Sequence, residues 1–274
     1  MVKGAISIAG MLVSFGAILL GIIMLGGDIS SILDPPSVVL VLLPTFASLI
    51  ATFPLSVLKK IPGHFKVFMR QEYNPNEYID TIVALAEKAR KEGLLAFEQE
   101  QVDDQLMAYA LRMMVDGLDK FSIKFALDDC INGIKERHSE AISVYDKAAA
   151  YAPAFGMCAT VVALVNMLLG LDFEDPAAIN NLGRNMATAL ITTLYGSVFA
   201  NIVFLPISGR LKLLHKKEMF VKTMICNGLL SILNGDNPRV IKDYLVEQLS
   251  AGDGRLFKEV QKSGSQQSED RING

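Results

Sequence analysis

The chain has no tryptophan and only three cysteines among its 274 residues. Cys130, Cys158 and Cys226 are odd in number and far apart in the sequence, which argues against a disulfide framework and favours reduced thiols with a structural role. Without tryptophan, an aromatic belt at a membrane interface would have to consist of Tyr and Phe side chains.

Charged residues are also scarce. They make up 20% of the sequence, against 51% hydrophobic residues and a mean hydropathy of +0.35, whereas a soluble domain of this length carries more charge. The net charge of −3 and the lack of a compact Lys/Arg run interleaved with aromatic residues argue against a nucleic-acid partner. The sequence contains no nucleophile–base pair, metal-ligand spacing or phosphate-binding loop, so we expect no catalytic residue, no metal site and no enzyme activity.

Four long apolar stretches contain no Asp, Glu, Lys, Arg or His, and they run over about 4–25, 37–58, 148–171 and 186–207. Each is close to the roughly 20 residues that cross a hydrocarbon core. The first is too long for a signal-peptide core and no small-residue cleavage site follows it, so we expect it to be retained. The sequence therefore predicts an all-α integral membrane protein with four transmembrane helices and a large helical cytoplasmic domain. The expected parts are the first two spans in 1–58, the cytoplasmic domain in 59–147, the third and fourth spans in 148–208, and cytoplasmic C-terminal helices with a tail in 209–274.

The orientation of the spans follows from the basic residues at their ends. Basic residues lie at the N-terminus, after span two, before span three and after span four. They are Lys3, Lys59, Lys60, Lys66, Arg70, Lys147, Arg210, Lys212, Lys216 and Lys217. The two short loops instead carry Asp28, Asp34, Asp172, Glu174 and Asp175, with Arg184 as their only basic residue. We therefore expect both termini and the 59–147 segment to be cytoplasmic.

The cytoplasmic segments are expected to be helical. Apolar residues recur at helical spacing from Ile79 to Ala86, with Asn74 or Asn76 as the cap, and Gly93 interrupts this helix. We expect a second helix from near Phe97 and a third over about 122–148 that continues into span three. After span four, a helix should end at the turn over 234–238, followed by a short helix over about 239–249. The polar tail from about Ser263 is expected to be disordered.

The missing ionisable groups matter for ion transport. Proton carriers need such a group at membrane depth, so if this chain moves ions, the titrating carboxylate must come from a partner. The spans offer hydroxyls and carboxamides instead, at Thr160, Asn166, Thr192, Thr193, Tyr195 and Asn201. Such oxygens can line an ion path, although a single one more often bonds its own helix backbone or a neighbouring helix.

Small residues and prolines mark further positions. Span one carries small residues on one face, at Ser7, Gly10, Ser14, Ala17 and Gly21, which suits packing either within the chain or against another subunit.

Pro44 and Pro54 lie in span two, Pro153 near the start of span three and Pro206 near the end of span four, and each can permit a kink. Pro153 and Pro206 both lie toward the cytoplasmic ends, with Thr160 and Thr192 deeper in the membrane. This arrangement suits an ion exit with adjustable helices.

Several motifs resemble one family. They are Asp34-Pro35-Pro36-Ser37, Phe53-Pro54, the run from Lys88 to Glu98, Tyr151-Ala-Pro-Ala-Phe-Gly-Met157 and Thr192-Thr-Leu-Tyr-Gly196. In this order they resemble the A subunits of flagellar stators, the MotA branch of the MotA/TolQ/ExbB proton channel family, over nearly the whole chain. The resemblance implies a homopentamer in the bacterial cytoplasmic (inner) membrane around two copies of a MotB-like single-span subunit, which brings a membrane Asp and a peptidoglycan-binding domain. Flow of H⁺ or Na⁺ past that Asp would drive rotation, with no bound cofactor.

The resemblance also implies roles for single residues. Arg90 and Glu98 match the positions that contact the rotor protein FliG, and Pro153 and Pro206 match two channel prolines. Thr160, Thr192 and Thr193 match hydroxyls associated with sodium-using members, and Tyr195 lies in the same motif of the expected ion path. The chain departs from the family pattern at Leu43-Pro44-Thr45 and Cys158-Ala159-Thr160, which bears on ion selectivity and local packing. For Arg90 and Glu98, a solvated charged face is the alternative interpretation.

Two other functions fit four spans less well. An energiser of the ExbB/TolQ type, driving an envelope process, is the main alternative, but its known members have three spans and lack the Asp-Pro-Pro-Ser motif. A transporter or scaffold acting alone is disfavoured, because the chain has no internal repeat and no charge within its spans.

Overall fold

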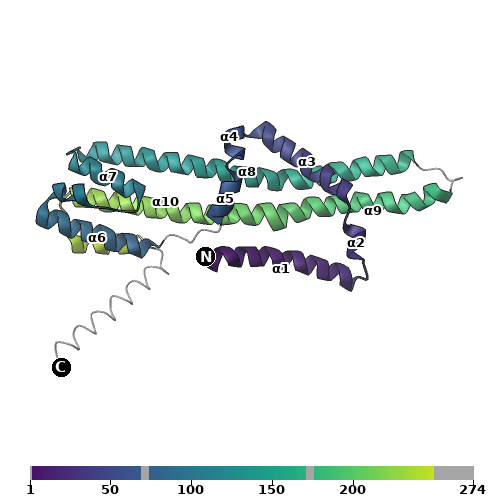
Figure 1. Ribbon diagram of the computed structural model, residues 1–274, viewed down its shortest axis with the longest axis horizontal. Helices are drawn as coiled ribbons and strands as arrows, with labels where there is room; N and C mark the ends of the chain where they lie inside the picture. The colour runs from purple at the N-terminus through teal and green to yellow at the C-terminus, as the bar shows by residue number, and fades with distance from the viewer. Residues whose placement is uncertain (1, 69–73, 171–175, 250–274) are drawn as a thin grey trace, which may run out of the picture. The chain divides into compact units, whose positions relative to one another are not determined.

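The computed structural model describes residues 2–68, 74–170 and 176–249, all within helices, turns and short connections. The tail that was expected to be disordered and most of the acidic loop between spans three and four lie outside these residues. Contacts divide the chain into two units, 1–71 with 137–214 and 72–136 with 215–274. Their helices are labelled in Figure 1, and each unit is described by itself.

The first unit contains the membrane spans. Its helices are α1 (Val2–Met24), α2 (Ile29–Ile32), α3 (Pro35–Thr52), α4 (Leu55–Leu58), α5 (Ile61–Phe68), the later part of α8 (Lys120–Leu169), α9 (Pro176–Val198), the π-helical turn η2 (Phe199–Phe204) and the start of α10 (Leu205–Leu233). Among the described residues, four helical stretches are long and apolar enough to cross a membrane, which confirms the predicted number of spans. The second span is shorter than expected and ends at Thr52 rather than Leu58, because Pro54 cannot continue the helix and the chain extends at Phe53. Pro44, by contrast, lies within α3 without ending it.

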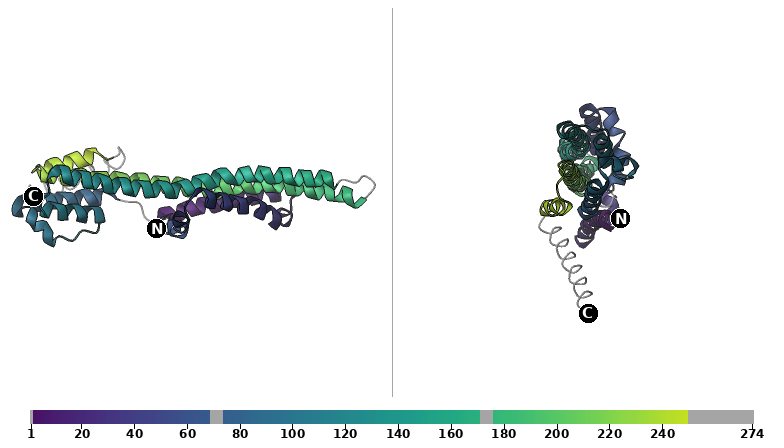
Figure 2. Two further views of the ribbon diagram at one scale, coloured as in Figure 1. Left: turned by 90° about the horizontal axis from the view of Figure 1, so that it is seen from above. Right: turned by 90° about the vertical axis from the view of Figure 1, so that its left-hand side faces the viewer.

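Spans three and four form the centre of this unit. In Figures 1 and 2 the part of α8 after residue 137 and α9 run side by side in opposite directions. Helix α3 packs against α9, and α1 contacts α2 and η2. None of the α1 membrane window is buried within the chain, so this span presents its surface to lipid or to another molecule.

The second unit is a helical domain with its own core. It is built from α6 (Pro75–Glu92), the 3₁₀ turn η1 (Leu94–Gln99), α7 (Gln105–Val115), the start of α8, the end of α10 and α11 (Pro238–Glu247). Fully buried side chains from α6, α7, α8, α10 and α11 meet here, including Ile79, Ile82, Met107, Met114, Ile123, Leu127, Ile225, Leu229, Ile241 and Leu245. Gly228 lets α10 approach α6, because a Cβ there would lie 2.8 Å from the Ile82 side chain.

The helix ends in this unit follow the capping residues. Asn74 caps α6 by accepting a hydrogen bond from the Asn76 amide, as expected. The expectation of a second helix from near Phe97 is wrong: α7 begins at Gln105, because the Asp104 carboxylate accepts from the amides of Leu106 and Met107. Phe97 lies instead in η1, where its side chain is buried in the core of this unit. The same Asp104 forms an ion pair of 2.6 Å with Lys222, and both side chains are only 9% exposed.

Two continuous helices agree with the prediction. Helix α8 is uninterrupted from Lys120 to Leu169, so the helix expected over about 122–148 continues into span three. After span four, α10 continues to Leu233, and the turn before Pro238 ends it.

Candidate functional site

Three threonines from spans three and four form one hydroxyl cluster. The Oγ1 atom of Thr160 on α8 lies 2.6 Å from that of Thr193 and 3.2 Å from that of Thr192, both on α9. Thr160 can also donate to the carbonyls of Gly156 and Ala189, each at 2.9 Å, and Thr192 donates to Ala189 at 2.7 Å. Since a hydroxyl has one proton and two acceptor lone pairs, the bonds within this cluster can rearrange by rotation of the hydroxyls alone.

The cluster has a buried and an accessible side. Thr192 is fully buried, Thr160 is partly buried and Thr193 is exposed on the surface of the single chain. The Thr193 hydroxyl can therefore reach a molecule that lies against this face of spans three and four.

Two glycines explain why the hydroxyls can meet. A Cβ at Gly196 would lie 2.7 Å from the Ala152 carbonyl oxygen and 3.1 Å from Pro153 Cα. A Cβ at Gly156 would lie 3.1 Å from the Thr192 carbonyl oxygen. Because glycine has no side chain, these two positions allow the helix backbones to approach closely, as small residues do in membranes. The sequence analysis did not single out these glycines, although both lie in the motifs quoted above.

Tyr195 occupies a different place from the threonines. Its hydroxyl donates to the Ile32 carbonyl at 2.7 Å and accepts from the Asp34 amide at 3.4 Å. Asp34 in turn caps α3, accepting from the amide and the hydroxyl of Ser37. The structure thus does not bring the Tyr195 hydroxyl into the threonine cluster but uses it to connect α9 with the turn between spans one and two.

The two carboxamides in the spans are also apart from the cluster. Asn201 donates to the Ser197 carbonyl of its own helix at 2.9 Å. Asn166 is exposed, three residues from the end of α8.

The expected channel prolines sit in different backbone settings. Pro153 lies within α8 at the close approach to Gly196, and the helix continues through it. Pro206 follows the π-helical turn η2, in which the Leu205 amide bonds the Ala200 carbonyl five residues back. A π turn is a local widening of the helix that is often found at functional sites, so span four departs from regular geometry directly before its proline.

Arg90 and Glu98 lie on the surface of the second unit. Arg90 is in the last turn of α6 and Glu98 is in η1, and Gly93 between them has a φ of 80° that allows the chain to turn sharply. Both side chains are exposed. Arg90 also lines a cleft of about 250 Å³ together with Asp236. Nearby, Lys88 pairs with Glu100 at 2.5 Å, and this hydrogen bond raises the pKa of the Lys88 ammonium.

The described residues contain no group of three His, Cys, Asp or Glu side chains that could hold a metal ion. Their polar chemistry within spans three and four consists of hydroxyls, carboxamides and backbone carbonyls.

Two family models match adjacent parts of the chain. Residues 8–93 match the N-terminal region of Motility protein A, and residues 98–224 match the MotA/TolQ/ExbB proton channel family.

Individual proteins match over most of their length. Motility protein A of Borreliella burgdorferi is 39% identical over 250 residues, which cover 90% of this chain and 94% of the relative. Chemotaxis protein PomA of Vibrio alginolyticus is 35% identical over 249 residues, covering 90% and 95%. Among solved structures, the flagellar MotAB stator complex from Bacillus subtilis contains a chain with a TM-score of 0.82 and 29% identity, covering 91% of this chain and 98% of that one.

Proposed function

Because the chain belongs to the MotA/TolQ/ExbB proton channel family, we propose that it is the ion-conducting A subunit of a bacterial flagellar stator. In this role, ions flow past a carboxylate of a partner subunit and the flow is coupled to torque on the rotor. The observation that carries the proposal is the hydroxyl cluster of Thr160, Thr192 and Thr193, in a chain whose spans hold no Asp, Glu, Lys, Arg or His.

The threonines fit the second half of an ion site. A carboxylate from a partner span, placed against the exposed Thr193, would supply the negative charge, and the hydroxyl oxygens would replace water around a dehydrated Na⁺ or form a hydrogen-bonded path for H⁺. Neutral oxygens suit transport, since the ion must also leave again. We propose the transported ion, H⁺ or Na⁺, as the only non-protein component. Tyr195 stays a predicted member of the path as part of α9, but its hydroxyl bonds the turn after α2 and does not contact the ion.

The backbone near the prolines supports a movable exit. Gly156 and Gly196 hold spans three and four together beside the threonines, while η2 and Pro206 weaken regular hydrogen bonding farther along span four. We propose that Pro153 and Pro206 allow the cytoplasmic ends to adjust as an ion leaves. One elementary charge crossing 100 mV releases about 2.3 kcal/mol, so rotation requires many small steps rather than one large rearrangement.

The partners follow from the same proposal. Five copies of this chain would surround two copies of a MotB-like, peptidoglycan-binding subunit in the inner membrane, with both termini of this chain cytoplasmic. The exposed Arg90 and Glu98 would contact FliG. Opposite charges across such a contact speed association more than they strengthen it, which suits an interface that forms and breaks at every step.

Deletion of the gene in its host tests this function. We expect flagella that are assembled, as seen by staining, but do not rotate, with swimming restored by the gene on a plasmid. Swimming speed at fixed pH, measured against Na⁺ concentration, would then identify the ion. Normal swimming of a strain with no second stator gene would contradict the proposal and favour an energiser of another envelope process.

A further inference from the structure

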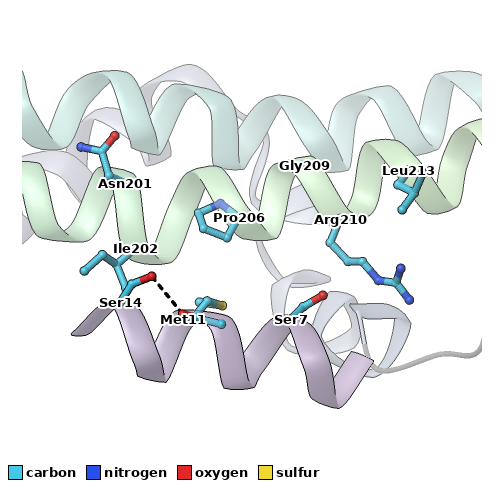
Figure 3. Close-up of a pocket in the computed structure, with 10 residues that line it drawn as sticks. Ser7, Met11, Ser14, Asn201, Ile202, Pro206, Gly209, Arg210 and Leu213 are labelled. Atoms are coloured by element: carbon cyan, nitrogen blue, oxygen red, sulfur yellow. Dashed lines mark hydrogen bonds between the residues drawn. The ribbon is translucent and has the colours of Figure 1, made fainter. Parts of the chain in front are cut away.

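A groove runs between α1 and the start of α10 in the first unit. Its volume is about 440 Å³. Span one contributes Ser7, Gly10 and Ser14, and the facing helix contributes Pro206, Gly209 and Arg210 (Figure 3). The three threonines of the proposed ion path do not line this groove, although the channel proline Pro206 does.

The small residues of span one leave this groove open. A Cβ added at Gly10 or at Gly209 would have no atom within 4 Å. In membranes, small residues usually allow two helices to come into contact, but here the glycines of the two helices face open space. Because atoms that line an empty volume have no contact partners on the open side, another molecule should fill the groove.

The charge of the groove indicates what kind of molecule this is. Among the residues whose side chains the structure describes, the lining includes one cation, Arg210, and no acid. Arg210 is only 8% exposed, and Figure 3 shows its side chain extending from α10 to the level of Ser7 on α1. Its guanidinium has five donors in a planar fork that matches a phosphate, so Arg210 can bind an anion and keep its contacts with the protein.

The rest of the lining suits a hydrocarbon chain. Met11, Ile202 and Leu213, which also line the groove, are apolar. Arg210 follows span four at the end that the distribution of basic residues places in the cytoplasm, where the leaflet is rich in anionic lipid. Basic pockets between transmembrane helices on this side are known to hold lipid head groups.

We propose that this groove binds an anionic phospholipid of the cytoplasmic leaflet. The phosphate lies on Arg210 and one acyl chain lies between Gly10 and Gly209. The proposal depends on the inward orientation of these span ends and does not depend on ion conduction. Since Pro206 lines the same groove, the bound lipid also contacts span four next to its irregular turn.

Native mass spectrometry of the purified stator complex tests the site. The complex is titrated with phosphatidylglycerol and, separately, with phosphatidylcholine of the same acyl chains. We expect phosphatidylglycerol adducts on the wild type and roughly fivefold or more weaker binding after Arg210→Gln, the factor that corresponds to one arginine contact with anionic lipid. Lys216→Gln, which removes an exposed charge from the same helix outside the groove, should bind as the wild type does.

A second variant keeps the test valid if Arg210→Gln fails to fold. Gly10→Leu fills the groove without changing the charge. It should lower phosphatidylglycerol binding to a similar extent, while the mass of the complex still corresponds to the same number of subunits. Equal binding of the two lipids, or unchanged binding in both variants, would overturn the proposal. Loss of subunits from the Gly10→Leu complex together with no lipid on the wild type would instead assign the groove to a neighbouring copy of this chain.

Discussion

The side-chain oxygens of Thr160 and Thr193 lie 2.6 Å apart, on two spans that run in opposite directions. The two residues are separated by 33 positions in the sequence, and they meet because glycines permit the helix backbones to approach. Thr193 is also the member of the hydroxyl cluster that is exposed to a partner. The first prediction concerns this pair.

Removing the hydroxyl of Thr160 should weaken ion binding. Thr160→Val keeps the shape of the side chain but not its oxygen, and a lost hydrogen bond to a charged group costs about 1.5–3 kcal/mol. The ion concentration for half-maximal swimming speed should therefore rise roughly tenfold or more. Thr160→Ser, which keeps the oxygen, is the control and should stay near the wild type. Equal ion dependence of all three proteins would remove Thr160 from the path.

Gly196→Ala should separate spans three and four. Its Cβ would lie 2.7 Å from the Ala152 carbonyl oxygen, a backbone atom that cannot rotate away. We expect a loss of about 1–3 kcal/mol of stability, as for other overpacked sites, and weak or absent swimming. The matched control is Gly183→Ala on the same helix, where an added Cβ meets no atom within 4 Å. Thermal unfolding of the purified complex measures both variants, and equal melting temperatures would contradict the close approach.

Tyr195→Phe tests the connection between α9 and the turn after α2. The change leaves the Ile32 carbonyl and the Asp34 amide without the Tyr195 hydroxyl, and an unsatisfied polar group costs about 1–3 kcal/mol. We expect faster hydrogen–deuterium exchange over residues 29–37 with an unchanged ion dependence of swimming. A changed ion dependence with unchanged exchange would place the Tyr195 hydroxyl in the ion path itself.

Charge reversal at Arg90 and Glu98 should weaken rotor contact without disturbing assembly. Both side chains are exposed, so Arg90→Glu with Glu98→Lys should yield a membrane complex of normal mass whose cells spread less in soft agar. Arg112→Glu reverses another exposed charge in the same unit and serves as the control. Wild-type spreading of the double variant would show that the pair is only a solvated surface.

The stability of the first unit should depend on pH through His64. Burial lowers the pKa of His64 below 6.5, with further contributions from the charges of Lys60 and His138, and its Nδ1 lies 3.4 Å from the Tyr145 hydroxyl. The unfolded chain then binds a proton at a pH where the folded chain does not, so stability falls as the pH drops below about 6.5. His64→Gln should reduce the loss in melting temperature between pH 7.5 and 5.5. An identical pH profile for the variant would exclude His64 as the cause.

Several helix boundaries show why local patterns were only partly sufficient. The apolar residues Leu94, Leu95 and Phe97 follow Gly93 and suit a helix, so the sequence predicts a start of α7 that is too early. The structure forms the short turn η1 there and begins α7 only after Asp104, because an acid that accepts two backbone amides defines a helix start more strongly than apolar spacing does. Likewise, apolar residues continue up to Leu58, so the sequence does not indicate that α3 ends at Thr52.

The candidate site was predicted in its residues but not in its arrangement. Thr160, Thr192 and Thr193 could be selected from the sequence because polar side chains are rare in these spans. Their hydrogen bonds depend on the relative register of α8 and α9, which in turn depends on Gly156 and Gly196. Similarly, the sequence shows that Pro206 lacks a backbone N–H donor. It does not predict the π-helical turn before Pro206, because that turn depends on how the neighbouring residues pack.

The sequence by itself determined the four spans, their expected orientation and the absence of Asp, Glu, Lys, Arg and His from them, because each depends on composition over lengths set by the membrane. The tertiary structure alone decided that the three threonine hydroxyls meet, that Tyr195 turns to Ile32 and Asp34, and that Arg210 lines an open groove beside Gly10. These features depend on contacts between residues far apart in the chain, and helical periodicity specifies which face a residue lies on but not which helix faces it.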